Sequence, residues 1–439
     1  MYRGYKPFSF SCSILLSNKN LKARLHPSLY MMQNIISRIN SAIHKNPLPI
    51  LFCFWAFVQL FLFLIFGIVT TGEATKYSYE AQNLLNNGHF SEPKYIFYSA
   101  YIFLHILFIE LKWETTGVYA IQLLVNLLSM YLLFRITFNL SKNILISFLC
   151  VFLMIVCYPW QYWTVHLYTE SLFCPLIIIF TYVLFFMKKK SRQQIVIAFL
   201  LFLLILTTRP TGLYFIPVMG FLFMYKLICA KRNIAALIYV LGICAVFLIT
   251  LNYAMKSGSS FDFIKPLIEN NVICDIPVTG QAPSPPAVLP GIEGNLAGVF
   301  EYIIHNPSQF LKMASLKFVS YWGMTRPYYS PSHNLGLICF FYPLYFFAAM
   351  GIFWLSKVNK FFTFYAAVLL IIFTLSVMFT CDDWNNRFIM PILPFVILFA
   401  SFGIKYFYER IINNVFAVMK SALVRLDSYE SISNIRGRK

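Results

Sequence analysis

Long apolar stretches, each long enough to cross a lipid bilayer, constrain the fold of this chain more than any other feature. A helix needs about 20 apolar residues to span the hydrocarbon core. Lysine and arginine are enriched in cytoplasmic loops, and threading by this rule places most of the 16 acidic residues outside and most of the 35 basic residues inside. The sequence thus predicts an all-α polytopic membrane protein of about ten transmembrane helices. The expected spans are 48–69, 117–138, 143–159, 167–187, 195–208, 211–229, 234–255, 335–355, 361–380 and 388–407.

Composition agrees with this class of protein. The chain is 59% hydrophobic and 12% charged, whereas soluble domains carry about a quarter charged residues. The net charge of +19 does not indicate nucleic-acid binding, because the positive charge lies in short loops and tails that face anionic lipid. The expected partners therefore include membrane lipids and exclude nucleic acid.

The threading divides the chain into three parts. Residues 1–47 form a basic cytoplasmic segment, 48–407 the transmembrane domain, and 408–439 a basic cytoplasmic tail. Two outer loops of the domain, 70–116 and 256–334, are longer than simple turns. Both termini are expected in the cytoplasm.

Three segments of these outer loops have a character of their own. Residues 95–111 are apolar, but a crossing there would place the basic loop Lys188–Lys190 outside, so we expect helices lying in the outer interface. Residues 307–322 have helical spacing and a proline in the first turn. The proline-rich stretch 277–290 is typical of an extended flap.

The cysteines do not form a metal-binding pattern. No Cys-x-x-Cys pair occurs among the ten cysteines, and no residues have metal-ligand spacing, so we expect no metal and no cofactor. Cys157, Cys274 and Cys381 fall near the outer side, where oxidising conditions permit a disulfide among them.

Ionisable side chains avoid the middle of every expected span, which argues against ion-coupled transport and directs attention to the outer rim. Glu73 follows the first span there. A carboxyl at the interface is partly desolvated, which raises its pKa toward that of a useful base. Alternatively, Glu73 caps the short helix that follows and interacts with its dipole.

A histidine and two charged residues add to the rim. His166 and Glu170 are four positions apart at the outer start of a span, a spacing that puts both on one helical face. Alternatively, they are simply an interfacial histidine and an acid at a helix terminus. Arg209 precedes Pro210 at a break between helices. Its two-pronged guanidinium suits phosphate oxygens, although it could also be an ordinary flank of a span.

The segment Asp382–Arg387 precedes the last span. Its acids, Asp383 among them, could cap the helix, but Arg387 lies at an outer span end that the charge rule disfavours. Arg326 and His333 add polar groups to the same side. Outer cations with an interfacial acid suit a lipid-borne phosphate: the cations hold phosphate oxygens and the acid takes a proton from an attacking hydroxyl.

With these residues in place, the chain resembles the multi-spanning GT-C glycosyltransferases that use polyprenyl-phosphate sugars, the branch of lipid A aminoarabinose transferase and protein O-mannosyltransferases. The likeness runs over 48–407, although the family acid is more often Asp than Glu. It is carried by Glu73, Tyr77, Ala81, Leu84, Leu85 and Gly88, and by YTESLF, TRPTGL, the Lys317–Trp322 region and NRFIMPILP.

The resemblance implies an enzyme at the outer face of a bacterial inner (plasma) membrane. It would move a sugar from a polyprenyl-phosphate donor to a glycolipid, envelope glycan or protein, with Glu73 as the base and Glu170 as a second catalytic residue. A lipid-linked sugar flippase or exporter, and a glycan ligase or polymerase of similar body plan, are the alternatives. The expected substrate-binding residues are Lys76, Tyr77, His166, Arg209, Arg326, His333, Asp383 and Arg387.

Overall fold

A computed structural model describes residues 41–187, 192–257, 263–274, 276 and 294–410. The expected proline-rich flap at 277–290 and most of the two basic terminal segments lie outside the described residues. Residues up to Ile50 form a unit of their own, so the packing described below is that of Leu51 onward.

The described residues are helical apart from loops and isolated β-bridges, and the prediction of an all-α, multi-pass membrane protein is confirmed at this level. Seven of these helices are long and apolar enough to cross a membrane, or up to eight if the bent pair of α8 (Ile144–Val156) with Tyr158–Val165 counts as one span. The seven are α4 (Pro47–Phe66), α7 (Glu114–Ser141), Pro210–Cys229 (η3 with α12), α13 (Asn233–Lys256), α17 (Pro331–Val358), α18 (Lys360–Phe379) and Arg387–Arg410, which begins with the 3-10 turn η4.

Two expected spans are occupied by shorter helices. The stretch 167–187 contains α10 (Glu170–Phe186), and 195–208 lies within α11 (Arg192–Thr208). Each has 17 residues, a length near the lower limit for a helix that crosses. The expected count of about ten is therefore reached only if the bent pair and both short helices cross.

Helix starts follow from local side-chain chemistry. Asn143 caps α8, its side chain accepting hydrogen bonds from the N–H groups of Leu145 and Ile146. Ser330 and Asn359 cap α17 and α18 in the same way. Such caps satisfy backbone donors that the first helical turn leaves unpaired, which is why these polar residues mark the span boundaries.

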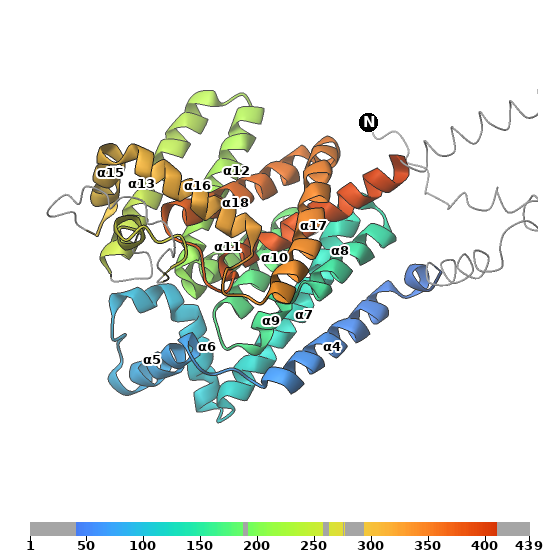
Figure 1. The fold of residues 1–439 in the computed structure, drawn as a ribbon, viewed down its shortest axis with the longest axis horizontal. Helices are drawn as coiled ribbons and strands as arrows, with labels where there is room; N and C mark the ends of the chain where they lie inside the picture. The colour runs from blue at the N-terminus through green and yellow to red at the C-terminus, as the bar shows by residue number, and fades with distance from the viewer. Residues whose placement is uncertain (1–40, 188–191, 258–262, 275, 277–293, 411–439) are drawn as a thin grey trace, which may run out of the picture. The chain divides into compact units, whose positions relative to one another are not determined.

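Buried polar pairs and close helix contacts join the spans, several of which run side by side in Figure 1. Trp55 of α4 donates to Asn126 of α7 at 2.8 Å. Gly351 of α17 and Gly403 of the last helix face one another, and a Cβ on Gly351 would collide with the carbonyl of Phe399. Within a membrane the hydrophobic effect does not drive helices together, and small residues such as glycine let their backbones approach this closely.

Residues 70–116, expected as the first outer loop, fold into helices that pack on the candidate spans. These helices are α5 (Glu73–Asn87), η1 (Pro93–Tyr98) and α6 (Ser99–Glu110), and α6 packs on α5, α7 and α11. The expected interfacial segment 95–111 corresponds to η1 and α6, neither of which is among the candidate spans.

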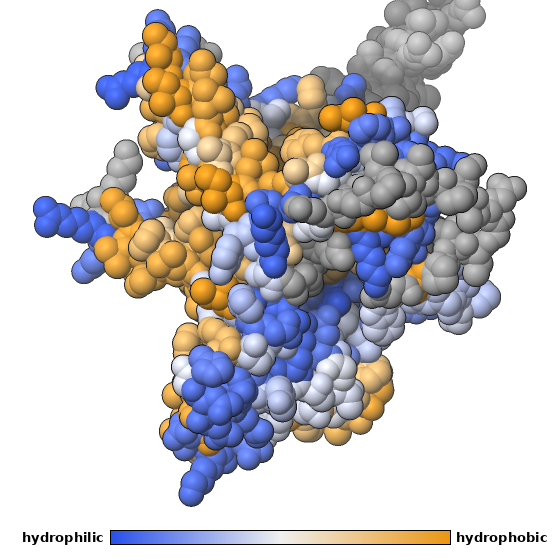
Figure 2. Space-filling model, turned by 90° about the vertical axis from the view of Figure 1, so that its left-hand side faces the viewer, coloured by the Kyte–Doolittle hydropathy of each residue, from blue (hydrophilic) through white to orange (hydrophobic). Residues whose placement is uncertain are grey.

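Residues 256–334, expected as the second outer loop, contain α14 (Lys265–Ile268), α15 (Leu296–His305) and α16 (Pro307–Gly323). The predicted helix at 307–322, with its proline in the first turn, is confirmed. Figure 2 shows hydrophilic and hydrophobic surface next to each other on one face of the molecule, the mixed character expected where a protein meets both lipid and water.

Candidate active site

Four charged residues meet at one site, and each lies at the start of a helical element. Glu73 is the first residue of α5 and Glu170 the first of α10. Arg209 directly precedes η3 (Pro210–Tyr214), and Arg387 is the first residue of η4 (Arg387–Ile392). Helix starts carry partial positive charge, which favours the two carboxylates at these positions.

Arg387 is the centre of this group. Its Nη2 lies 2.7 Å from Glu73 Oε1, its Nε 2.7 Å from Asp383 Oδ2, and its Nη1 3.4 Å from Glu170 Oε1. Arg209 forms an ion pair with the same Glu170 oxygen. The Lys76 ammonium lies 3.6 Å from Glu73 Oε2. Carboxylates and cations thus alternate, and each offsets the charge of its neighbours.

Exposure separates the two glutamates. The Glu170 side chain is fully buried (0% exposed), whereas that of Glu73 is 33% exposed. The side chains of Arg209 and Arg387 are 10% and 12% exposed. Glu170 is therefore a buried partner of the two arginines, and Glu73 is the carboxylate that a substrate can reach.

The pKa of Glu73 departs from the sequence-based expectation. Burial raises this pKa. The charge of Arg387, the hydrogen bond from Arg387 and the charge of Lys76 together lower it by more than burial raises it, so that the pKa falls from 4.5 to about 2. The prediction of a raised pKa is wrong because it counted desolvation without the facing cations. Glu73 is fully ionised at neutral pH in the free protein.

A cavity of about 100 Å³ lies against these residues, several times the roughly 15 Å³ that one water needs. Glu73, Tyr77, Arg209 and Arg387 all contribute to its lining. Sequence reasoning missed several further lining residues, among them Tyr98, Thr169 and Tyr214. For Thr169, its position beside Glu170 was a signal.

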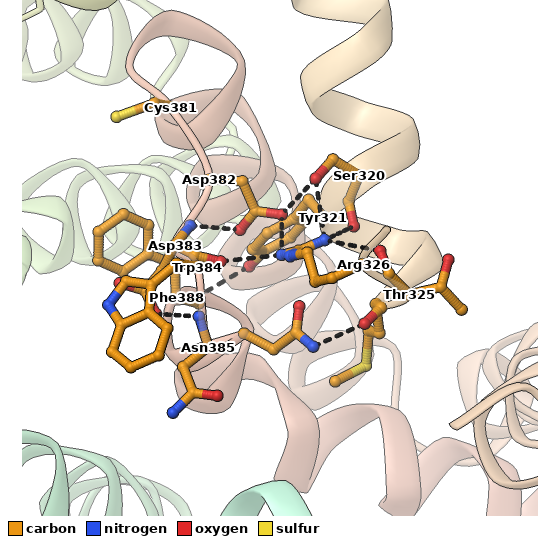
Figure 3. Close-up of polar contacts among 12 residues, drawn as sticks. Ser320, Tyr321, Thr325, Arg326, Cys381, Asp382, Asp383, Trp384, Asn385 and Phe388 are labelled. Atoms are coloured by element: carbon orange, nitrogen blue, oxygen red, sulfur yellow. Dashed lines mark hydrogen bonds and ion pairs between the residues drawn. The ribbon is translucent and has the colours of Figure 1, made fainter. Parts of the chain in front are cut away.

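Arg326 lies in a separate buried cluster, which Figure 3 shows. Its Nη2 lies 2.5 Å from Asp382 Oδ2 and donates to the carbonyl of Asp383 at 2.9 Å. Arg326 also donates to the carbonyl of Ser320 at 3.0 Å. The side chains of Arg326 and Asp382 are each 1% exposed, so the structure does not bring Arg326 to the cavity.

Asp383 supports the site through Arg387. Its Oδ2 accepts from Arg387 Nε, and its Oδ1 accepts from the N–H of Asn385 at 2.9 Å. Asp383 is not the helix cap, because the N-cap of η4 is Asn386 and no side-chain cap bond forms there; Asp383 instead ties down the turn that carries Arg387. The carboxylate is not part of the cavity lining.

The two candidate histidines lie away from the cavity lining. The prediction that His166 shares a helical face with Glu170 is wrong: His166 has extended backbone after η2 (Trp163–Val165), and α10 begins only at Glu170. His166 Nδ1 lies 3.1 Å from the Tyr162 carbonyl. His333 stacks on Tyr329, with 4.4 Å between the ring centroids.

A disulfide fastens the loop 256–334 to this site. It joins Cys274 to Cys381, both of which line the cavity, while Cys157 is buried and unpaired. Beside it, the Cys274 N–H donates to the Asp382 carbonyl at 2.8 Å. Disulfides persist in oxidising compartments, a property shared by the outer side of a plasma membrane.

Comparison with family models and curated proteins gives no match, so the functional proposal depends on the geometry of the site. Within the described ranges, no group of three or more His, Cys, Asp or Glu residues could hold a metal ion. The fold and the site define the class: an all-α multi-pass membrane protein in which charged residues line a cavity.

Proposed function

We propose that this protein is an integral membrane glycosyltransferase that moves a sugar from a polyprenyl phosphate to an acceptor on the outer side of the membrane. One observation carries the proposal: the partly exposed Glu73 carboxylate and the Arg387 guanidinium lie 2.7 Å apart on the wall of one cavity. A base beside phosphate-binding cations is what this transfer requires.

The cations supply a place for the donor phosphate. Arg209 and Arg387 line the cavity, and Lys76 lies beside Glu73. Guanidinium groups bind phosphate oxygens through paired donors, and these three would hold the charge of the leaving polyprenyl phosphate. Arg326 is no longer part of this proposal, because its guanidinium is committed to Asp382.

The transfer step then has a simple balance. An acceptor hydroxyl or amine attacks the anomeric carbon, the bond from that carbon to the phosphate oxygen breaks, and the electron pair leaves with the phosphate. Glu73 takes the proton of the acceptor. The sugar is transferred with inversion, because the acceptor attacks opposite the leaving group.

Donor binding would also make Glu73 a better base. In the free protein Arg387 and Lys76 hold the pKa of Glu73 down at about 2. A bound phosphate shares the charge of both cations, so their effect on Glu73 weakens and its pKa rises. Glu73 therefore becomes an effective base once the donor is bound, whereas in the free protein its low pKa limits proton uptake.

Orientation and span number belong to the same proposal. The site lies on the outer face of a bacterial inner membrane, both termini are cytoplasmic, and ten spans cross it, counting the bent pair, α10 and α11. The Cys274–Cys381 disulfide beside the cavity supports the outward orientation, because cytosolic thiols are kept reduced. Labelling of position 76 by a membrane-impermeant amine reagent only in permeabilised cells would contradict it.

A lipid-linked sugar flippase is the rival from another class, and Glu73→Gln separates the two. A flippase needs the cations but no base. With a purified polyprenyl-phosphate monosaccharide and membrane acceptors, we expect transfer to fall by roughly 10²–10⁴-fold in Glu73→Gln while donor binding persists. Glu92→Gln, an exposed outer acid paired with Lys94, is the matched control. Unchanged transfer in Glu73→Gln would remove the base from the proposal.

A glycan ligase or polymerase is the second rival, and it differs in its donor. Such an enzyme uses an oligosaccharide on a lipid diphosphate. Supplying the monosaccharide phosphate and the oligosaccharide diphosphate in parallel reactions decides between them, because only the true donor is consumed.

A further inference from the structure

Six aromatic rings form a continuous strip that ends at Glu73. In spatial order they are Tyr329, His333, Tyr158, Tyr162, His166 and Tyr168. Successive ring centroids lie 4.4, 6.2, 5.3, 4.5 and 5.6 Å apart. The rings come from the turn before α17 and the first turn of that helix, from α9 (Tyr158–Tyr162) and from the loop before α10, so only the tertiary structure brings them together.

Each end of the strip is fixed by a hydrogen bond. The Tyr168 hydroxyl accepts from the Glu73 N–H at 3.0 Å, which places the last ring directly beside the proposed base. At the other end the Tyr329 hydroxyl donates to the Trp384 carbonyl at 3.0 Å. Trp384 itself is 50% exposed, and in Figure 3 its indole lies on the side of the loop away from Arg326.

The strip offers ring surface to a ligand. Tyr158 is 46% exposed, while Tyr162, Tyr168, Tyr329 and His333 are half-buried. His166 is buried and packs between Tyr162 and Tyr168, so a ligand meets the other five rings. Two of the successive pairs, His333–Tyr158 and His166–Tyr168, pack edge to face, and Tyr329 stacks on His333. Such packing keeps the rings in place, so a ligand that lies on them meets a preorganised surface. No member of the strip carries a carboxylate or an ammonium group, and a neutral ligand therefore fits it better than a charged one.

We propose that this strip is a binding platform for a neutral oligosaccharide, which it guides toward Glu73. A pyranose ring has one apolar face of C–H groups and a rim of hydroxyls. The apolar face packs on an aromatic ring, and the hydroxyls bond to polar tips such as the tyrosine O–H. Several rings in series suit several sugar units. The inference rests on the proposed function insofar as the oligosaccharide would be the acceptor.

The membrane interface is the competing explanation, because tyrosine and tryptophan anchor proteins at that depth. Two features favour a sugar. His333, a half-buried ring of the strip, is not a residue type of the usual aromatic belt, and the strip ends beside the partly exposed Glu73 carboxylate.

Saturation-transfer NMR on the full chain in lipid nanodiscs tests the platform without any donor. The probes are cellotetraose and chitotetraose. We expect transfer to the sugar C–H protons for at least one of them, and binding weakened roughly three- to ten-fold by Tyr158→Ala. Tyr158→Phe retains the ring and should bind as the wild type does. Tyr408→Ala, a tyrosine of matched exposure (49%) elsewhere in the chain, should leave binding unchanged.

The outcomes separate the platform from the proposed function. If neither sugar binds, or if Tyr158→Ala binds as tightly as the wild type, the rings belong to the interfacial belt and the platform is overturned. A chain that binds the sugar through Tyr158 but transfers nothing from any donor retains the platform and loses the glycosyltransferase proposal.

Discussion

Arg387 and Glu73 are 314 positions apart in the sequence, yet their side chains meet at 2.7 Å. The same guanidinium contacts Asp383 and Glu170. Three carboxylates from three parts of the chain thus converge on one arginine. These contacts join the three carboxylates and Arg387 into a single site.

Replacing Arg387 with lysine should break this convergence. An ammonium cannot reproduce the planar set of donors that serves three carboxylates and a phosphate. We expect transfer to fall by roughly 10²–10³-fold, with a higher KM for the donor. Steady-state kinetics with a polyprenyl-phosphate sugar measures this. Arg135→Lys, at an arginine that donates to the Tyr131 hydroxyl, is the control, and equal loss in both variants would contradict a specific role.

The pH dependence of transfer should move when Lys76 is removed. Lys76 helps to hold the pKa of Glu73 at about 2, so Glu73 is ionised in the free protein and kcat/KM should show no acidic limb from it above about pH 3. In Lys76→Met the pKa of Glu73 rises, and the limb should shift to higher pH. The control is Lys94→Met, whose partner is Glu92. Profiles that superimpose for all three proteins would count against Glu73 as the base.

Reduction of the disulfide should loosen the site. Cys274 and Cys381 close a loop of 107 positions, and removing such a link costs roughly 2–4 kcal/mol of stability. Because Asp382 and Asp383 directly follow Cys381, activity should fall together with the thermal midpoint in Cys274→Ser. Cys339→Ser, which removes an exposed free thiol, serves as the reference. Full activity after complete reduction would show that the tether is dispensable.

Lys317 should destabilise the fold at neutral and acidic pH. It is fully buried in α16, its Nζ has no hydrogen-bond partner among the described residues, and burial lowers its pKa from 10.5 to about 7. The folded state thus binds fewer protons than the unfolded chain between pH 7 and 10.5, and stability rises with pH in that window.

Lys317→Met tests this sign directly. The thermal midpoint should rise in the variant at pH 6, and the gain should shrink as the pH increases from 7 toward 10. Lys312→Met, an exposed lysine of the same helix, should show no such trend. A gain that is constant with pH would mean that packing, not charge, sets the difference.

Helix contact at Gly351 should tolerate no side chain. A Cβ there collides with the Phe399 carbonyl, whereas Gly336 of the same helix faces open space. We expect Gly351→Leu to lose about 1–3 kcal/mol of stability or more, while Gly336→Leu stays near the wild type. The fraction of monodisperse protein after heating in detergent measures both, and equal behaviour would place the close contact elsewhere.

Local chemistry in the sequence was sufficient for much of the fold. Apolar length predicted most of the spans, Pro307 marked the start of α16, and the charge pattern kept 95–111 out of the candidate spans. Each of these depends on a residue and its near neighbours. The site residues Glu73, Arg209 and Arg387 could also be proposed, because each lies at the expected outer end of a span, where a site for a lipid-borne phosphate would be.

Only the tertiary structure decided what these residues do to one another. Desolvation of Glu73 was foreseeable, but the distance to Arg387 was not, and that distance reverses the sign of the pKa shift. The burial of Arg326 against Asp382 and the line of rings from Tyr329 to Tyr168 are likewise invisible to spacing along the chain. Electrostatic and ring contacts act over a few ångströms of space, and a sequence records only the order of its residues.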